Sequence, residues 1–263
     1  MFSHNDKGIA LIAVIIIVAV TAIAVLGIAT FISNALVLNT VRAAREQAIY
    51  AAQAGIYSSL YDYLATVPRY WVKALNVNIL GNAYYGAGRD ANFLLIDADN
   101  PQTLDSGGTN NLLQRIALMN INQTQAITVN QMKVEWANFG GTLDLVTLRG
   151  VNRTVSASSG QLFGISPVFT LLAQQSFSGP ANNAWRFTAT IPNNAIIIVT
   201  FYFTDGSTRK AYLFNNGRSG NNEFSITATG EVRGTINWKR TVEATYDVGV
   251  GRITSWQEAD SHI

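Results

Sequence analysis

The acidic cluster between residues 97 and 105 holds the side chains whose spacing best suits metal chemistry. Asp97, Asp99, Asn100 and Asp105 supply hard oxygen atoms at short intervals, and oxygen is the ligand type that calcium prefers. The cluster lacks the glycine and the terminal glutamate of an EF-hand loop. Asp and Asn also cap turns, and Pro101 lies within the cluster. Two interpretations therefore stay open: a calcium site, and a solvated loop.

Side chains that commonly carry catalysis are scarce in this chain. There is no cysteine, which excludes thiolate nucleophiles and Cys-based metal sites. The two histidines, His4 and His262, stand near the two ends of the chain, so nucleophile-and-base arrangements lack a positioned base. No phosphate-binding loop or dinucleotide fingerprint is present. The sequence therefore predicts a protein that is not an enzyme, with no cofactor apart from the calcium considered above.

The composition indicates a folded protein with an unusual charge distribution. Hydrophobic residues make up 48% of the 263 residues, which is enough for a sizeable core. Charged residues make up only 13%, about half the usual share. The formal net charge of +2 is too small to indicate a nucleic-acid binder. The low charge reflects one long uncharged stretch near the N-terminus.

This uncharged stretch runs from Ile9 to Ile32 and contains 24 residues. As a helix it measures roughly 36 Å, against about 30 Å for the hydrocarbon core of a bilayer. A cleaved secretory signal has an apolar core of only about 7–15 residues. Residues 9–32 are therefore predicted to span a membrane.

The helical pattern continues well beyond the length that a membrane requires. Residues 33–66 contain no proline, only Gly55 as glycine, and many alanines, and Pro68 is the first firm stop. The sequence predicts one helix from Ile9 to about Ala65, roughly 85 Å long. Residues 33–66 form its amphipathic half.

Aromatic residues gather near the end of this helix and just after it. They are Tyr57, Tyr61, Tyr63, Tyr70, Trp71, Tyr84 and Tyr85. Such residues form a binding surface for glycans or DNA in some proteins. Here, Tyr57 and Tyr61 lie one helical turn apart, so we expect them to anchor the helix against the rest of the protein.

The remaining chain, residues 67–263, is predicted to form a globular head that is mostly antiparallel β from about Ala126. Ile196 to Phe203 is apolar on both faces, as expected for a central strand, and Asp205-Gly206 then signals a hairpin. Thr128 shares the sequence parity of Met132, Val134 and Trp136 in another predicted strand. The C-terminal stretch is predicted to form three strands, with turns near Gly230 and near residues 249–251. The expected fold class is α+β.

A short leader, residues 1–8, ends in Lys7-Gly8 directly before Ile9. This leader, the following Ile-Ala-Leu-Ile and the segment AREQAIYAAQAGIYSSL resemble the type IV pilin and pseudopilin superfamily, most closely minor pilins with a PilX-type N-terminal region. The C-terminal stretch ending in Ser-Trp-Gln-Glu resembles the closing strands of the same subunits. The resemblance covers roughly the first 65 and the last 40 residues. It implies that prepilin peptidase cuts between Gly8 and Ile9.

One position departs from the pattern of this family. The resemblance implies a glutamate at the fifth position after the cut, whereas this chain has Ala13. A carboxylate inside lipid is costly, and in the family it pairs with the N-terminal ammonium group of a neighbouring subunit. Ala13 cannot form that pair. Two interpretations stay open: a subunit at the tip or start of a filament, and simple tolerance of alanine.

The resemblance implies a minor pilin or pseudopilin-like subunit of a type IV pilus or a type II secretion-type filament, with the head displayed outside for assembly priming, adhesion or DNA uptake. Its expected partners are other pilins through the N-terminal helix, prepilin peptidase, the inner-membrane assembly platform and, before assembly, membrane lipid. The expected location is the bacterial inner membrane with a cytoplasmic N-terminus, and then the filament at the cell surface. The alternatives are a permanently anchored periplasmic or surface binding domain, and an anchored enzyme of unfamiliar type.

Overall fold

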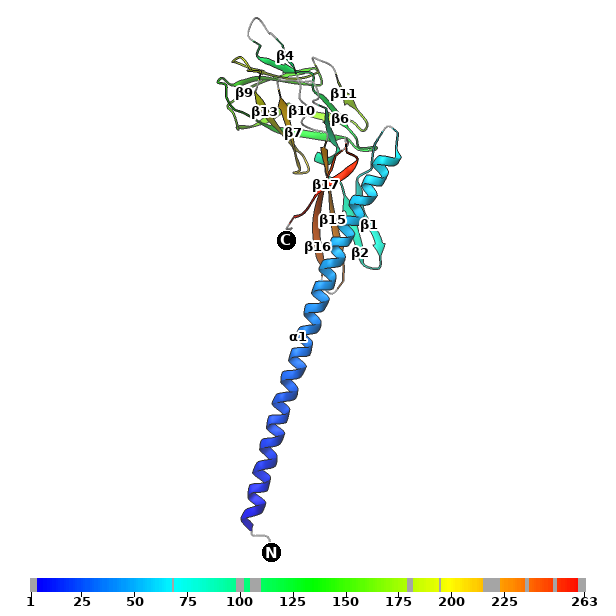
Figure 1. Cartoon of the computed structure of the whole chain (residues 1–263), viewed down its shortest axis with the longest axis vertical. Helices are drawn as coiled ribbons and strands as arrows, with labels where there is room; N and C mark the ends of the chain where they lie inside the picture. Colours follow the sequence, from blue (N-terminus) through cyan, green and yellow to red (C-terminus); the bar gives the residue numbers. More distant parts are fainter. Residues whose placement is uncertain are drawn as a thin grey trace.

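The chain combines one long helix with a β-rich head, and the helix projects far below the head (Figure 1). The computed structural model describes residues 4–67, 69–97, 102–104, 110–178, 182–193, 195–214, 223–234, 237–247 and 250–259. Within these residues the sheets are largely antiparallel. The fold is therefore α+β, as the sequence predicts.

Helix α1 (His4–Ala65) is a single element of 62 residues, which corresponds to about 93 Å at 1.5 Å per residue. It begins five residues before Ile9, so the second half of the predicted leader is helical as well. It ends at Ala65, close to the predicted stop at Pro68, because proline lacks the backbone donor that a further turn requires.

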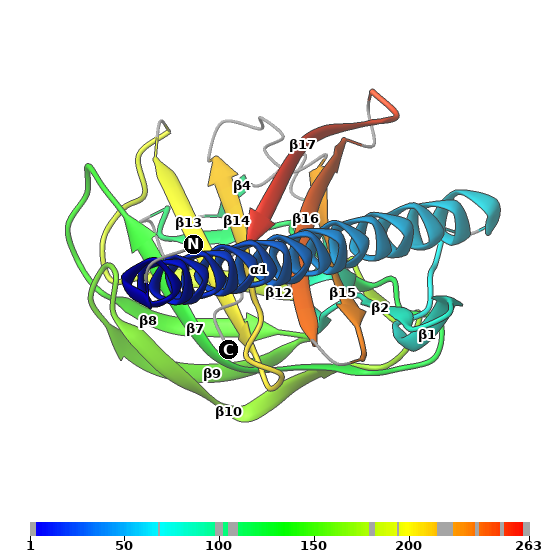
Figure 2. The same cartoon turned by 90° about the horizontal axis from the view of Figure 1, so that it is seen from below.

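Five strands form the sheet that carries the upper half of α1, here called the helix-bound sheet. Its strand order is β1-β2-β15-β16-β17 and all its pairs are antiparallel. The strands are β1 (Ala74–Leu80), β2 (Ala83–Ala87), β15 (Glu223–Val232), β16 (Trp238–Asp247) and β17 (Arg252–Ala259). Seen from below, α1 runs across this sheet (Figure 2). The three C-terminal strands are those expected from the sequence.

The next layer is a four-stranded sheet with the order β10-β7-β13-β14. Its strands are β7 (Ile127–Trp136), β10 (Leu162–Leu171), β13 (Ile196–Phe203) and β14 (Thr208–Phe214). Strand β13 lies between two neighbours, as its doubly apolar sequence predicts. The β13–β14 hairpin turns at Gly206, whose φ of +80° is a conformation that glycine adopts without strain.

Two further sheets, of five and three strands, complete the head. One has the order β4-β5-β12-β8-β9 and the other β11-β6-β3, with the short helix α2 (Asp90–Phe93) just before β3. Their strands are β3 (Leu94–Asp97), β4 (Gln102–Leu104), β5 (Leu112–Gln114), β6 (Ala117–Asn120), β8 (Leu143–Leu148), β9 (Val151–Ala157), β11 (Ser176–Phe177) and β12 (Asn183–Phe187).

The β structure begins at Ala74, much earlier than the predicted boundary near Ala126. Strands β3 to β6 have only three or four residues each. Runs this short do not show enough alternation to be separated from loops by periodicity. The predicted start of the β region near Ala126 therefore corresponds to the ten-residue strand β7, and not to the first strand of the head.

A β-bulge in β7 overturns one predicted face. Val129 pairs with Phe203 and Gln131 pairs with the preceding residue, Tyr202, so Asn130 is the extra residue. The bulge shifts the side-chain alternation by one position. The buried face therefore continues from Met132 to Val129, and Thr128 does not belong to it.

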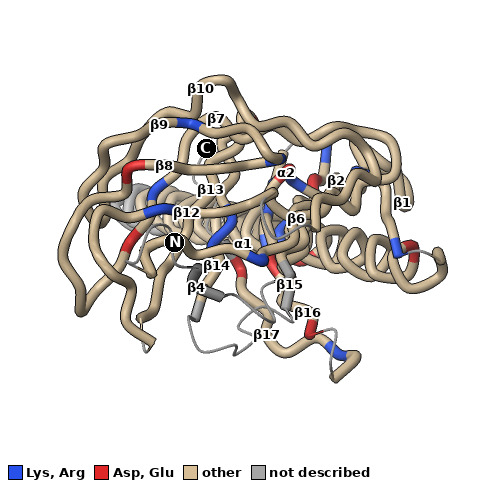
Figure 3. Tube along the Cα trace, turned by 90° about the horizontal axis from the view of Figure 1, so that it is seen from above, with Lys and Arg blue, Asp and Glu red and all other residues tan. Residues whose placement is uncertain are grey.

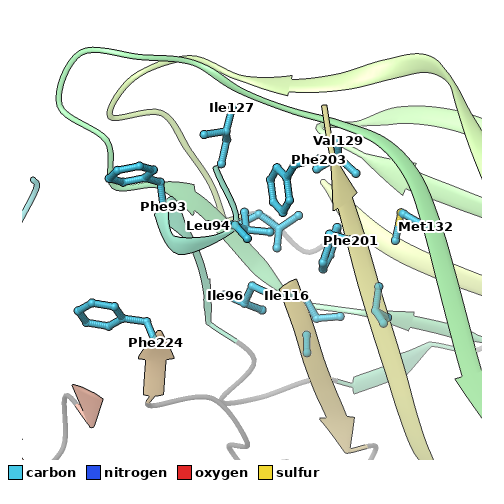
Figure 4. Packing of buried hydrophobic residues seen from close by; sticks show 14 of the residues in the cluster. Phe93, Leu94, Ile96, Ile116, Ile127, Val129, Met132, Phe201, Phe203 and Phe224 are labelled. Atoms are coloured by element: carbon cyan, nitrogen blue, oxygen red, sulfur yellow. The ribbon is translucent and has the colours of Figure 1, made fainter. Parts of the chain in front are cut away.

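One core connects the helix to the outer sheets. Figure 4 shows Phe93 and Leu94 beside Ile127 and Phe203, with Phe224 of the helix-bound sheet facing the same interior. Ile56 of α1 and Trp185 of β12 belong to this same core and are fully buried. The upper part of the helix is therefore integral to the folding of the head.

Candidate functional site

The lower half of α1 presents an apolar surface that no described part of the chain covers. Every described large apolar side chain from Ile12 to Leu38 is between 52% and 75% exposed. Contiguous apolar surface of this extent is not stable in water. The helix is long and apolar enough to cross a membrane, and the structure places this segment where lipid or other helices can surround it (Figure 1).

The two threonine hydroxyl groups in this half are hydrogen-bonded within the helix itself. Thr21 Oγ1 donates to the carbonyl oxygen of Ile17 at 2.7 Å, and Thr30 Oγ1 donates to that of Leu26 at 2.8 Å. A polar group inside lipid is costly unless it is hydrogen-bonded. These two threonines therefore leave the surface compatible with a surrounding that contains no water.

The upper half of α1 docks on the helix-bound sheet through a stripe of mostly small side chains. Its buried residues follow at intervals of three or four, which is one face of a helix. They are Ala44, Ala48, Ala51, Ala52, Gly55, Ile56, Ser59 and Tyr63. One face of the upper half of α1 is therefore buried on the sheet.

Gly230 of β15 is the point of closest approach between helix and sheet. A Cβ atom built on Gly230 lies 1.8 Å from the carbonyl oxygen of Ala48 and 2.6 Å from the backbone nitrogen of Ala52. Only glycine fits there. The turn predicted near Gly230 lies a few residues later, between Val232 and Trp238, and Gly230 itself lies inside β15 at the backbone of α1.

The predicted anchoring role holds for only one of the two tyrosines. Tyr57 is 58% exposed but its ring lies 5.6 Å from that of Trp256 in β17, whereas Tyr61 is 72% exposed. Tyr63 is the tyrosine that packs, edge-to-face on Phe224 with ring centroids 4.8 Å apart. Burial raises the pKa of the Tyr63 hydroxyl, and the nearby charge of Arg69 opposes this shift only in part. The helical phase, not the presence of tyrosine, decides which rings are buried.

The predicted processing residues lie at the free end of α1. Lys7, Gly8, Ile9 and Ala13 all fall within the helix, far from the head (Figure 1). Lys7, Gly8 and Ile9 are consecutive in the helix, and Ala13 follows Ile9 by about one turn. Their roles in processing and in filament register stay predictions.

The predicted calcium ligands fall largely outside the described residues. Asp97 ends strand β3, whereas Asp99, Asn100 and Asp105 are not among the residues that the structure describes. Within the described part of the chain, no group of three His, Cys, Asp or Glu side chains is placed to hold a metal. The calcium site therefore stays a prediction.

Sequence reasoning missed a polar junction beside α2. Lys73 Nζ lies 3.4 Å from Asp90 Oδ1 and 3.8 Å from Asp205 Oδ2. Asp205 also accepts hydrogen bonds from the backbone nitrogens of Asp90 and Ser207, at 3.0 Å each. These contacts join the β13–β14 turn to the start of α2 and to Lys73, just before β1, across more than a hundred residues of sequence. The Asp205-Gly206 turn signal indicated a hairpin and held no sign of this second role.

The two carboxylates of this junction have opposite electrostatic environments. Burial and the negative charge of Asp205 raise the pKa of Asp90. The positive charge and hydrogen bond of Lys73 lower it by less, so the pKa remains raised. Burial alone would also raise the pKa of Asp205, but hydrogen bonds from Ser207 and from the Asp90 backbone outweigh it and lower that pKa. Asp205 is therefore the carboxylate that the fold stabilises in its charged form.

Charges on the head are of mixed sign. In the view of Figure 3, Lys and Arg positions are interspersed with Asp and Glu positions over the sheets. Such a face does not produce the field that steers nucleic acid. The exposed apolar helix is the more distinctive surface.

No protein-family model, no curated protein and no solved structure matches this chain.

Proposed function

We propose that this protein is a membrane-anchored subunit of a helical filament, of the minor pilin or pseudopilin type. Its helix first lies in a bilayer and then exchanges lipid for the helices of neighbouring subunits, while the head is displayed outside. The resemblance of the first 65 and last 40 residues to that superfamily supports this proposal. Prepilin peptidase and an inner-membrane assembly platform are its proposed partners.

The observation that carries the proposal is the continuity of α1. A simple anchor needs about 20 residues, yet this helix runs for 62 residues without a break. Its docked half shares the core of the head. The exposed half is therefore held rigidly relative to the head, so that packing the helices of several subunits would fix the positions of their heads. A flexible linker after the membrane would not have this effect.

Processing provides the first test. Co-expression with a prepilin peptidase is expected to remove residues 1–8, so that N-terminal sequencing reads Ile9 onwards. Replacing Gly8 with a bulky residue (Gly8→Leu) should block the cut, and Gly27→Leu, inside the apolar stretch, should not. An intact Met1 in the presence of active peptidase counts against the proposal and favours a permanent anchor.

Cross-linking provides the second test, and the absence of cysteine in the chain makes it free of background. Cysteines at exposed Ala24, or about three turns earlier at Ala13, should form disulfides with matching cysteines in another pilin when the assembly platform is present. Ala52→Cys is the matched control, because Ala52 is fully buried against the head. Equal cross-linking of Ala24→Cys with and without the platform would show collision in the membrane and would refute assembly.

A second candidate function, an anchored surface domain that binds a ligand, is favoured by one observation. The head contains an open, polar cleft of about 540 Å³, within the size range of small-molecule sites. This function uses residues 9–32 only as an anchor, so it predicts no helix cross-links and no dependence on Gly8. The two tests above separate the candidates.

A further inference from the structure

The polar cleft lies between two sheets, and the solvent-facing side of each sheet borders it. Strands β13 and β14 of the four-stranded sheet form one wall, β15 and β16 of the helix-bound sheet form the other, and α2 with the β13–β14 turn closes the floor. Its lining includes three cations, one acidic residue, one aromatic residue and many hydroxyl groups: Arg89, Arg209, Lys210, Glu243, Tyr212 and Thr200, with Asn92 and further serines and threonines. The cleft is independent of α1, which packs on the opposite side of β15.

Hydroxyl groups dominate the wall that the helix-bound sheet contributes. Ser225 pairs with Thr245 and Thr227 pairs with Glu243 across β15 and β16. The residues between them, such as Ile226 and Ala244, are buried toward the helix side. This alternation places donors and acceptors, rather than apolar groups, along the cleft.

Thr200 shows that the polar capacity of the cleft is not used up within the fold. Its side chain is 5% exposed and lines the cleft. Its buried Oγ1 has no hydrogen-bond partner among the residues that the structure describes. A buried hydroxyl without a partner is uncommon and carries a desolvation cost. Such a group in the wall of an open cleft is suited to hydrogen-bond a ligand.

The charged and aromatic groups of the cleft narrow the class of ligand. Arg89 and Lys210 are exposed cations, and Lys210 pairs directly with Thr200 across the hairpin. Glu243 stands on the facing wall as an acceptor. Tyr212 is 42% exposed and offers a ring face. The cations suit a carboxylate on the ligand. The hydroxyl groups and Glu243 suit the hydroxyl groups of a sugar. The ring of Tyr212 suits the apolar face of a sugar ring.

The floor of the cleft is held in place before any ligand arrives. Asn92 Nδ2 donates to the carbonyl oxygen of Ser225 at 2.8 Å, and the Ala91 backbone nitrogen donates to Ser207 Oγ at 3.0 Å. These bonds connect α2 to the β15 wall and to the β13–β14 turn, which joins the two strands of the other wall. Since the walls are already fixed relative to each other, binding requires little ordering of the protein.

We propose that this cleft binds a sugar unit that carries a carboxylate, with Lys210 and Arg89 on the carboxylate and Thr200, Thr227 and Glu243 on the hydroxyls. The volume of about 540 Å³ accommodates one or two sugar rings. The inference goes beyond the filament function and does not rest on it, because a subunit that never assembles would retain the cleft.

Calorimetry with the full chain in detergent micelles tests the proposal, with glucuronate, glucose and inorganic phosphate as probes. Glucuronate is expected to bind, and glucose to bind at least about tenfold more weakly because it lacks the charge-assisted contact. Lys210→Ala should weaken glucuronate binding about tenfold, and Thr200→Val about fivefold, since each removes one hydrogen-bonding group. Arg252→Ala, which removes an exposed cation of β17 outside the cleft, is the matched control and should bind like the unaltered chain.

Three results would overturn the proposal. The first is that glucuronate produces no heat of binding at about 10 mM, which corresponds to a binding free energy of only about −2.7 kcal/mol. The second is that phosphate binds as tightly as glucuronate, which indicates a simple anion site. The third is that Lys210→Ala binds glucuronate like Arg252→Ala, which places the sugar elsewhere. Melting curves of both Lys210→Ala and Thr200→Val are recorded alongside, so that unfolding is not mistaken for loss of the site.

Discussion

The two halves of α1 belong to one continuous helix and yet meet the rest of the molecule in opposite ways. From Ile12 to Leu38 its large aliphatic side chains are exposed, whereas from Ala44 to Tyr63 one face is buried on the helix-bound sheet. The docked face consists mainly of alanine, and the exposed half carries Ile, Val, Leu and Phe. The half with more apolar surface is therefore the one without an intramolecular partner.

This difference shows that side-chain size, and not hydrophobicity alone, separates the two roles. Alanine allows backbones to approach until only glycine fits opposite, as at Gly230. Large exposed aliphatic groups instead require an external surrounding, either lipid or other helices. Substitutions in the exposed half should therefore affect insertion or assembly, whereas substitutions on the docked face should affect the stability of the head.

The largest effect is expected from charges in the exposed half. Val20→Lys combined with Ile23→Lys should weaken membrane insertion by about 2.5–3.5 kcal/mol for each lysine, and should leave the melting temperature of the head unchanged. Membrane fractionation measures the first quantity and circular dichroism the second. Glu46→Lys combined with Gln47→Lys, at exposed positions of the docked half, is the matched control. Equal membrane retention of both double variants would contradict the assignment of the exposed half.

Gly230→Ala should cause the next largest effect, in the docked half. The added Cβ meets backbone atoms of Ala48 and Ala52, which cannot rotate away, so we expect a loss of about 3 kcal/mol in the free energy of unfolding. Denaturant unfolding of the full chain in detergent measures it. Gly164→Ala is the control, since nothing lies within 4 Å of its Cβ position. Equal stability of the two variants would mean that helix and sheet are not in contact.

The same substitution in each half tests the comparison directly. Ala52→Leu overpacks a fully buried site and should destabilise the head by about 1–3 kcal/mol. Ala24→Leu, at an exposed site, should leave unfolding unchanged within about 0.5 kcal/mol. Both are measured by thermal unfolding of the full chain. A destabilising Ala24→Leu would reveal intramolecular packing of the lower half.

The junction beside α2 makes the head sensitive to acid through one of its two carboxylates. The lowered pKa of Asp205 adds stability above the ordinary carboxyl pKa of 3.8, and this stability is lost as the pH falls through the lowered value. Asp205→Asn should therefore cost about 1–2 kcal/mol at pH 7 and should flatten the acid limb of the stability curve.

Asp90 is the matched control for that measurement. Its raised pKa makes stability depend on pH in the opposite direction. The contribution of Asp90 to stability is fully present below pH 3.8 and is lost as the pH rises through the raised pKa. Asp90→Asn should therefore leave stability at pH 7 unchanged or slightly higher. If Asp90→Asn is the more damaging of the two, the assignment of their environments is wrong.

The smallest effect is expected from a ring contact between the docked half and the edge of the helix-bound sheet. The rings of Tyr57 and Trp256 lie 5.6 Å apart and connect α1 to edge strand β17. Tyr57→Ala should cost about 0.5–1 kcal/mol in unfolding free energy, whereas Tyr61→Ala, at 72% exposure, should cost less. Thermal unfolding distinguishes them. Equal losses would show that exposure, and not the ring contact, determines the effect.

Most of the helix was predictable because its signals are local. The absence of charge from Ile9 to Ile32 and of proline up to Pro68 predicts one helix, which the structure has from His4 to Ala65. The hairpin at Gly206 was predictable for the same reason. Each of these depends on neighbours a few residues apart, and local conformational preference is what a sequence pattern records.

The contacts that link distant segments were not predictable. Gly230 appeared to be a turn residue, and only the approach of Ala48 from the other end of the chain shows why glycine is required there. The cleft combines residues from four strands and a turn, and Thr200 carries no local sign that its hydroxyl lacks a partner. The chain alone determined that a long apolar helix precedes a β-rich head. Only the tertiary structure decided which face of that helix is buried, because burial depends on groups that the fold brings together across the whole sequence.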